Sequence, residues 1–396
     1  MLCTGFPGDT PDAEVLEALA ELAPAGVVLF SRNVSTPEGT RRLVAAIRNA
    51  VGESTFVAVD QEGGRVARLR AGFTPLPSAM AVGACGDPEL AERLGAAIAC
   101  DLRRIEADVN FAPVLDLALE PANTVIGTRS FGDDAQRVAA LGAAVVRGLE
   151  GEGVAATLKH FPGLGASARD PHRELPRIDV ALATLRAREL VPFQAGFAAG
   201  ARAAMSAHAL VPAFDRAQPA TLSARILGDV LRGELGFEGA VFTDALEMQA
   251  IAGGAGSARG AVLAVAAGAD CVLFGEGPAA AQAARDALVD ALERGELSDA
   301  RLRDAAARVA RLRSRVKAGG ERDAPDGEIS RATAQRAIAA LRGSDRLERA
   351  HPVTVVSFEG GSFDGAGEPA GAQASLSLAL RRRNLRSELM RVPLEP

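Results

Sequence analysis

Short apolar runs alternate along most of the chain with longer segments that carry apolar residues at helical spacing, and this alternation limits the fold more than any other feature. Seven runs are rich in Val, Ala and Phe: GVVLF (26–30), TFVAVD (55–60), ADVNFAP (107–113), VAATLKH (154–160), RAAMSAH (202–208), GAVFTD (239–244) and ADCVLFG (269–275). The amphipathic segments include 36–51, 88–106, 134–151, 182–200, 222–235 and 256–268. Strands that alternate with helices predict a parallel sheet with crossover helices.

The number of runs and the places of polar residues favour a closed barrel. With a first strand near MLCTGF the runs number eight, which predicts an α/β fold of the (β/α)8 TIM-barrel type. An open doubly wound sheet is the alternative, but the GxGxxG turn usual after its first strand is missing. The runs that contain Asp60, His160, His208 and Asp244 each end in that residue. In a barrel these four side chains would face one another across a single mouth.

Beyond residue 318 the composition changes to AGGERDAPDGE, which is typical of a linker. We predict a catalytic barrel over 1–318, a linker over 319–334 and a truncated or degenerate C-terminal segment over 335–396. A helix (330–342), the strand PVTVVSF (352–358) and an Arg-rich helix are expected there. This part is too short to close a second sheet, so it is predicted to be a short, incomplete α/β appendage that leans on the barrel.

Composition excludes several classes of partner. The net charge is −6, and acids and arginines are interleaved, which argues against a nucleic-acid or anionic-membrane surface. No stretch reaches the roughly 18 apolar residues of a membrane span. Four cysteines without C-x-x-C spacing and an opening MLCTGFPGDTPDAEV without a basic or apolar signal region predict a cytoplasmic location. The sequence predicts neither a metal nor a cofactor, and it gives no indication of oligomeric state.

The stretch KHFPGLGASARDPHRELP (159–176) concentrates residues that are rare elsewhere. Lysine and arginine total 44, and only Lys159 and Lys317 are lysines, so Lys159 suggests a site that needs a compact charge. His160 and His172 lie in the same stretch. Because Trp and Tyr are absent, any sugar would be held by hydrogen bonds in a small pocket and not on aromatic platforms.

Two carboxylates are candidates for chemistry. Asp244 ends a buried strand, where a carboxylate is costly unless it is paired, and it is either a nucleophile or the N-cap of the next helix. Asp170 stands two residues before His172, a spacing that lets a carboxylate orient the imidazole so that it can donate and recover a proton near neutral pH. The alternative is a turn in which Asp170 only accepts backbone amides.

Further charged residues could bind hydroxyl groups. DQEGGRVARLR (60–70) and NTVIGTRSFG (123–132) present Asp60, Arg68 and Arg129, which could grip adjacent sugar hydroxyls or could form loop salt bridges. Lys159 at a strand end could instead form a Schiff base, as in barrel aldolases. That chemistry would leave Asp244 and the pair of Asp170 and His172 without a clear division of roles.

Together these segments resemble glycoside hydrolase family 3, specifically its bacterial β-N-acetylglucosaminidase branch. The matching stretches are GVVLFSRN, VAVDQEGGRVARLR, VNFAPVLDL, VIGTRSFG, TLKHFPGLG, DPH, MSAH and FTDALEM, in family order over about residues 26–275. The resemblance implies that Asp244 is the nucleophile and that Asp170 with His172 is the acid/base dyad. It also implies that Asp60, Arg129, Lys159 and His160 hold the sugar hydroxyls. Arg68, His208 and Met248 are further predicted substrate-binding residues.

The implied reaction is retaining, exo-acting hydrolysis of terminal β-linked N-acetylglucosamine, with cell-wall muropeptide fragments as the expected substrate. Three alternatives stay open: a phosphorylase of the same glycosides, a β-glucosidase or β-xylosidase, and a catalytically inactive sugar-binding protein. Relatives commonly read KHFPGHGDT where this chain reads KHFPGLGAS, so Leu164 and Ala166 replace a histidine and an aspartate. We expect altered loop packing or aglycone contacts there, with activity retained because the dyad and nucleophile positions are filled.

Overall fold

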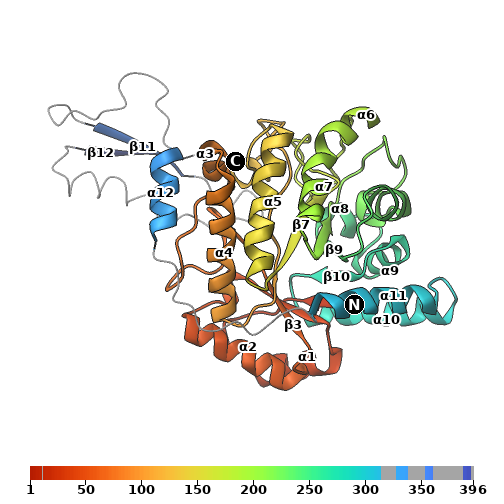
Figure 1. The fold of residues 1–396 in the computed structure, drawn as a ribbon. Coiled ribbons are helices and arrows are strands. Elements are labelled where there is room, and N and C mark those ends of the chain that lie inside the picture. Colours follow the sequence, from red (N-terminus) through yellow and green to blue (C-terminus); the bar gives the residue numbers. More distant parts are fainter. Residues whose placement is uncertain (11, 314–326, 338–352, 360–386, 394–396) are drawn as a thin grey trace.

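Eight parallel strands form a closed barrel in a computed structural model that describes residues 1–10, 12–313, 327–337, 353–359 and 387–393 (Figure 1). The strands are β1 (Leu2–Thr4), β2 (Gly26–Leu29), β3 (Phe56–Val59), β6 (Val109–Asn110), β7 (Ala155–Phe161), β8 (Ala203–Ser206), β9 (Ala240–Ala245) and β10 (Cys271–Phe274). Their order is β1-β10-β9-β8-β7-β6-β3-β2, and β2 pairs with β1 to close the ring. The predicted TIM barrel is therefore confirmed, and the open sheet is excluded.

Helices cover the outside of the barrel. They include α1 (Ala13–Leu22), α2 (Pro37–Val51), α4 (Pro88–Arg104), α5 (Ala135–Gly151), α7 (Leu190–Ala198), α9 (Ser257–Ala267), α10 (Pro278–Glu293) and α11 (Asp299–Arg313). Shorter helices are α3 (Ala79–Cys85), α6 (Leu182–Thr184) and α8 (Gln249–Ala252), and π-type turns span Leu185–Glu189 and Arg225–Glu234. Side-chain caps at Thr36, Asp87 and Asp134 start α2, α4 and α5 by accepting otherwise unpaired backbone N–H groups. All six predicted amphipathic segments are helical.

The interior of the barrel is filled at its N-terminal end. Phe56 and Phe111 both meet Phe242 edge to face, with ring centroids 5.8 and 5.2 Å apart. Leu312 of α11 belongs to the same inner cluster, and its carbonyl accepts a hydrogen bond from Arg202, which immediately precedes β8. Side chains thus close this end, and space for a ligand is left at the C-terminal ends of the strands.

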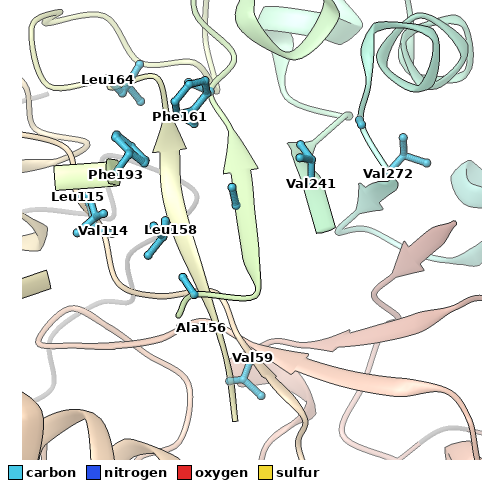
Figure 2. Close-up of a cluster of buried hydrophobic side chains, with 14 of the residues drawn as sticks. Val59, Val114, Leu115, Ala156, Leu158, Phe161, Leu164, Phe193, Val241 and Val272 are labelled. Atoms are coloured by element: carbon cyan, nitrogen blue, oxygen red, sulfur yellow. The ribbon is translucent and has the colours of Figure 1, made fainter. Parts of the chain in front are cut away.

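A second, outer cluster packs the barrel against its helices, and Figure 2 shows part of it. Leu158 and Phe161 of β7 lie in this cluster with Phe193 of α7, and the rings of Phe161 and Phe193 meet edge to face at 5.3 Å. Successive side chains of a strand point to opposite faces. Because Leu158 faces the helices, Lys159 beside it is directed into the barrel.

The C-terminal part differs from the prediction in two places. Helix α12 (Glu328–Ala337) makes residues 328–334 helical where a linker was expected; residues 319–326 and 338–342 lie outside the described residues. The expected strand is present as β11 (Val353–Glu359), and it pairs in parallel with β12 (Ser387–Pro393). Strand β12 takes the last part of the stretch that was predicted to be an Arg-rich helix; the part of that stretch up to residue 386 lies outside the described residues. Cross-strand pairing outweighs the helix propensity of this stretch.

Helix α12 packs against the barrel domain, beside α3 and α4 (Figure 1). Ile329 and Thr333 are buried there. Arg336 pairs with Asp87 at 2.8 Å, and the Cys85 thiol donates to the carbonyl of Thr333 at 3.6 Å. Helix α12 is therefore held on the barrel, mainly by residues that were predicted to belong to the linker. None of the helices in the described ranges is long and apolar enough to cross a membrane.

Candidate active site

A cavity of about 400 Å³ opens at the C-terminal ends of the strands. Eight of the ten predicted site residues line it: Asp60, Arg68, Arg129, Lys159, His160, His172, Asp244 and Met248. Asp170 lies behind His172, and His208 lies behind the wall. The ends of the barrel strands therefore bring residues from distant parts of the chain to one cavity, as predicted from their positions at the ends of apolar runs.

Asp244 stands near the end of β9 with its side chain 22% exposed to the cavity. One carboxylate oxygen accepts the backbone N–H of Ala245 at 2.8 Å, and the other lies 3.9 Å from Nε2 of His160. Met248, and not Asp244, occupies the N-cap position of the next helix, so the capping alternative is wrong. Burial raises the pKa of Asp244, but the electrostatic effect of the three imidazoles that face it, together with the N–H of Ala245, outweighs burial and holds the pKa below its usual value.

Asp170 and His172 form a hydrogen-bonded pair in the loop that follows β7. Oδ1 of Asp170 lies 2.8 Å from Nδ1 of His172 and also accepts the backbone N–H of His172 at 2.9 Å. The predicted turn and the predicted pair are thus both present. The His172 side chain is 30% exposed, and because Nδ1 is occupied, Nε2 is the ring nitrogen left for other contacts.

A buried ion-pair network holds the cations of the cavity floor. Lys159 contacts Asp60 at 2.7 Å and Glu62 at 2.6 Å, and Arg129 makes a two-pronged contact with Glu62 at 2.8 and 2.9 Å. Arg68 lies 3.8 Å from Asp60. Each of these groups therefore has a charged partner in a site from which much of the water is excluded.

Glu62 was not predicted, although it lies in the stretch DQEGG. Its burial would raise its pKa, but Arg129 and Lys159 outweigh burial and lower the pKa well below the usual range. Conversely, Asp60 and Glu62 offset burial and raise the pKa of Lys159. A lysine held in its charged form is a poor amine nucleophile, so the geometry argues against the Schiff-base alternative.

Asp116 is the second residue that was not predicted. Its carboxylate is fully buried and lies 2.6 Å from Nδ1 of His160, which leaves Nε2 of that ring directed at Asp244. The stretch VNFAPVLDL contains Asp116, and the signal available was a single acid just after an apolar run. Such a residue cannot be told from an ordinary loop aspartate without the fold.

His208 does not line the cavity, which corrects the prediction that it binds substrate. Nδ1 lies 2.7 Å from the hydroxyl of Thr221, and Nε2 donates to the carbonyl of Ala245 at 3.0 Å. Burial lowers the pKa of His208. Because both ring nitrogens are occupied, the contact supports the residue next to Asp244, and the ring is not available to a ligand.

Across the barrel from β7, the cavity has a rim of mixed charge that the sequence did not predict. Phe30, Arg32, Glu247 and Glu276 contribute to it. The guanidinium of Arg32 lies 4.5 Å from the centre of the Phe30 ring, and that of Arg68 lies 5.7 Å from it. Glu247 accepts backbone N–H groups of Gly275 and Glu276 at 3.2 and 3.1 Å, so it ties the loop after β9 to the loop after β10.

Leu164, the position that departs from KHFPGHGDT, lies in the cavity wall, whereas Ala166 does not. The side chain of Leu164 is 2% exposed. Its backbone N–H donates to Asp116 at 2.6 Å, and its carbonyl accepts from Asn123 at 3.1 Å. In the described ranges, no group of three or more His, Cys, Asp or Glu side chains could hold a metal ion.

Comparison with known proteins identifies the family of the chain. The family model of the glycosyl hydrolase family 3 N-terminal domain matches residues 5–312. The chain belongs to glycosyl hydrolase family 3. It is 46% identical to a β-hexosaminidase of Stenotrophomonas maltophilia over 256 residues, which are 63% of this chain and 76% of that protein. The predicted enzyme class, a glycoside hydrolase of the β-hexosaminidase type, is confirmed.

Two solved structures of family 3 resemble the fold. A β-N-acetylglucosaminidase from Paenibacillus sp. FPU-7 superposes with a TM-score of 0.93 at 36% identity, covering 100% of this chain and 78% of that one. NagZ from Neisseria gonorrhoeae, solved in complex with N-trifluoroacetyl-D-glucosamine, gives 0.69 at 31% identity, covering 85% and 96%.

Proposed function

We propose that this family 3 enzyme removes terminal β-linked N-acetylglucosamine with retention of configuration, with Asp244 as nucleophile and with His172 and Asp170 as the acid/base dyad. The observation that carries the proposal is that Asp244 and His172, 72 residues apart in sequence, line one cavity whose floor holds Asp60, Lys159 and Arg129. One similar structure is that of a β-N-acetylglucosaminidase, and another is that of a protein in complex with an N-acylated glucosamine, which supports the sugar assignment.

In the first step, an Asp244 oxygen attacks the anomeric carbon and the bond to the leaving oxygen breaks. Nε2 of His172 gives its proton to that oxygen, because Nδ1 is held by Asp170. In the second step, Nε2 takes a proton from water, which displaces Asp244 from the glycosyl ester. A retaining mechanism of this type works with the two groups about 5 to 5.5 Å apart.

The charges of the site suit these roles. A nucleophilic carboxylate must be ionised, and the lowered pKa of Asp244 favours the ionised form. The buried network presents the oxygens of Asp60 and the N–H groups of Lys159 and Arg129 in fixed positions, where they can accept and donate hydrogen bonds to sugar hydroxyls. The enzyme can therefore bind the sugar without reorganising charged groups.

The natural substrate and the location are part of the same proposal. The resemblance to the bacterial β-N-acetylglucosaminidase branch, with the predicted cytoplasmic location, favours muropeptide fragments released during cell-wall turnover. The glycan is small and terminal, which suits a cavity of about 400 Å³ better than an open groove would.

A panel of aryl β-glycosides tests the proposal. Wild type should hydrolyse the N-acetylglucosaminide in preference to the glucoside and xyloside, and proton NMR should show the β-anomer as the first product. Asp244→Ala should reduce kcat by about 10⁴-fold or more while keeping the melting temperature. Preference for the glucoside, an α-anomer product or a fully active Asp244→Ala variant would each refute it. Sugar phosphate formed in the presence of phosphate would identify a phosphorylase instead.

A further inference from the structure

Asp116 has no assigned role, yet it lies buried behind the cavity lining, in the loop that follows β6 and against the end of β7. Its side chain is 0% exposed. It contacts three N–H groups: the ring Nδ1 of His160 at 2.6 Å, the backbone N–H of His160 at 3.1 Å and the backbone N–H of Leu164 at 2.6 Å. A buried carboxylate is retained at low cost only when it is paired in this way.

We propose that Asp116 is a positioning residue for the reaction, because it fixes the His160 ring with Nε2 directed at the carboxylate of Asp244. The proposal rests on the proposed role of Asp244 as nucleophile. Asp116 touches neither the cavity nor the reacting atoms, so it acts entirely through His160.

The proton positions follow from the contacts. An ionised carboxylate accepts hydrogen bonds and cannot donate them. The contact with Asp116 therefore places a proton on Nδ1 of His160. The opposite nitrogen, Nε2, then lies 3.9 Å from an oxygen of Asp244. When Nε2 also carries its proton, the ring bridges two carboxylates as a cation, and this favours the ionised nucleophile.

Several other groups face the two ends of this contact. Three imidazoles lower the pKa of Asp244, and His160 has the largest effect. The other two are His208, behind β8, and His172, in the loop after β7. The N–H of Ala245 adds a smaller contribution. His160 itself faces Asp116, Asp244 and His208, while Lys159 next to it is paired with Asp60 and Glu62.

Asp116 also has a structural role, since its contacts with two backbone N–H groups fix the turn from His160 to Leu164. The test must therefore include a readout that a loss of stability does not move. Asp116→Asn keeps the size of the side chain and one acceptor oxygen, and it removes the negative charge. Asp101 provides a matched control: its side chain is also 0% exposed, it accepts the backbone N–H of Thr74 at 2.8 Å, and it does not line the cavity.

The first experiment measures kcat/KM against pH with an aryl N-acetylglucosaminide for wild type, Asp116→Asn and Asp101→Asn. Asp116→Asn should lower kcat/KM by about 10- to 100-fold and move the acidic limb to higher pH by about one unit. Asp101→Asn should leave the acidic limb in place even if it melts earlier. An unchanged limb for Asp116→Asn overturns the proposal. A wild-type protein without activity on any glycoside would count against the proposed function and not against Asp116.

The second experiment does not depend on activity. The chain has only four histidines, so ¹⁵N-histidine labelling gives four ring systems, and His160 is assigned by its loss in His160→Gln. We expect a protonated Nδ1 for His160 in wild type and a mixture of tautomers in Asp116→Asn. A His160 ring without a proton on Nδ1 in wild type overturns the proposal, even if Asp116→Asn does not fold.

Discussion

The side of the cavity that holds Lys159 and the side that holds His172 are built in opposite ways. Lys159, Glu62 and Arg129 have side chains that are 3 to 5% exposed, and each is paired with an opposite charge within 3 Å. Lys159 is on β7 itself, and Glu62 is in the hairpin of β4 (Gln61–Gly63) and β5 (Val66–Ala67) that directly follows β3. Hydrogen-bond donors and acceptors for the sugar are thus fixed before the substrate arrives.

The other side places its imidazole on a loop. His172 is 30% exposed, and its ring contacts Asp170 from the same turn. A group that gives up and recovers a proton in each cycle must exchange protons with water, and a half-buried loop position allows this. The difference indicates that the paired charges of the barrel bind the sugar, whereas His172 on the loop supplies the proton.

The strongest test of this division replaces the loop imidazole. His172→Ala should reduce kcat by about 10²- to 10⁴-fold for a glycoside with a poor leaving group, because that oxygen needs a proton as the bond breaks. With a dinitrophenyl glycoside, whose leaving group needs no proton, the rate of the first step should fall far less. Comparison of kcat/KM for the two substrates measures the effect.

Arg173→Ala is the control, because this neighbouring side chain is 71% exposed and approaches Asp170 only at 4.0 Å. It should retain wild-type rates with both leaving groups. An equal loss for both leaving groups in His172→Ala would mean that the ring shapes the cavity and does not supply the proton.

The paired side is tested by Glu62→Gln. Removing this charge leaves Lys159 and Arg129 buried with one carboxylate fewer, which should lower the free energy of unfolding by about 3 kcal/mol and raise KM. Urea denaturation measures the first effect. Glu92→Gln is the matched control: it breaks a pair with Arg147 at 2.9 Å in which both side chains are 47% exposed, and it should cost less than about 1 kcal/mol.

The difference in the free energy of unfolding between wild type and Glu62→Gln should depend on pH. Because the pKa of Glu62 is lowered in the folded state, its contribution is fully present above the ordinary value of 4.5 and is lost as the pH falls towards the folded-state pKa. The gap in stability between wild type and Glu62→Gln should therefore be widest above about pH 5 and should narrow in more acidic buffer. A gap that widens on acidification would contradict the assigned pairing.

The sequence predicted the barrel and most of the cavity for a common physical reason. Parallel strands buried on both faces need continuous apolar runs, so a polar residue such as Asp244 or His160 at the end of a run is conspicuous. Their meeting at one mouth follows from the closed topology. The same rule failed for His208, because the end of a strand does not tell whether a side chain enters the cavity or packs behind the wall.

Glu62 and Asp116 could not be predicted because their roles depend on pairing across the fold. Glu62 is 97 residues from Lys159 in sequence, and Asp116 is 44 residues from His160. An acid that compensates a buried cation looks in sequence like any surface acid of this Arg-rich chain. The strand β12 was missed for a related reason, since its pairing with β11 is set by tertiary context.

Leu164 lines the cavity, and it lies in sequence between Lys159 and His172; its replacement offers the mildest test. Leu164→His changes only the side chain in the cavity wall, because the bonds to Asp116 and Asn123 are made by backbone groups. We expect a few-fold change in kcat/KM, one that depends on the aglycone, and no shift of the acidic limb. Ala166→Asp, outside the cavity lining, is the paired control and should leave the aglycone preference unchanged. If Leu164→His lowered kcat/KM as much as His172→Ala does, the cavity wall would take part in proton supply. The two sides of the cavity would then not have separate roles.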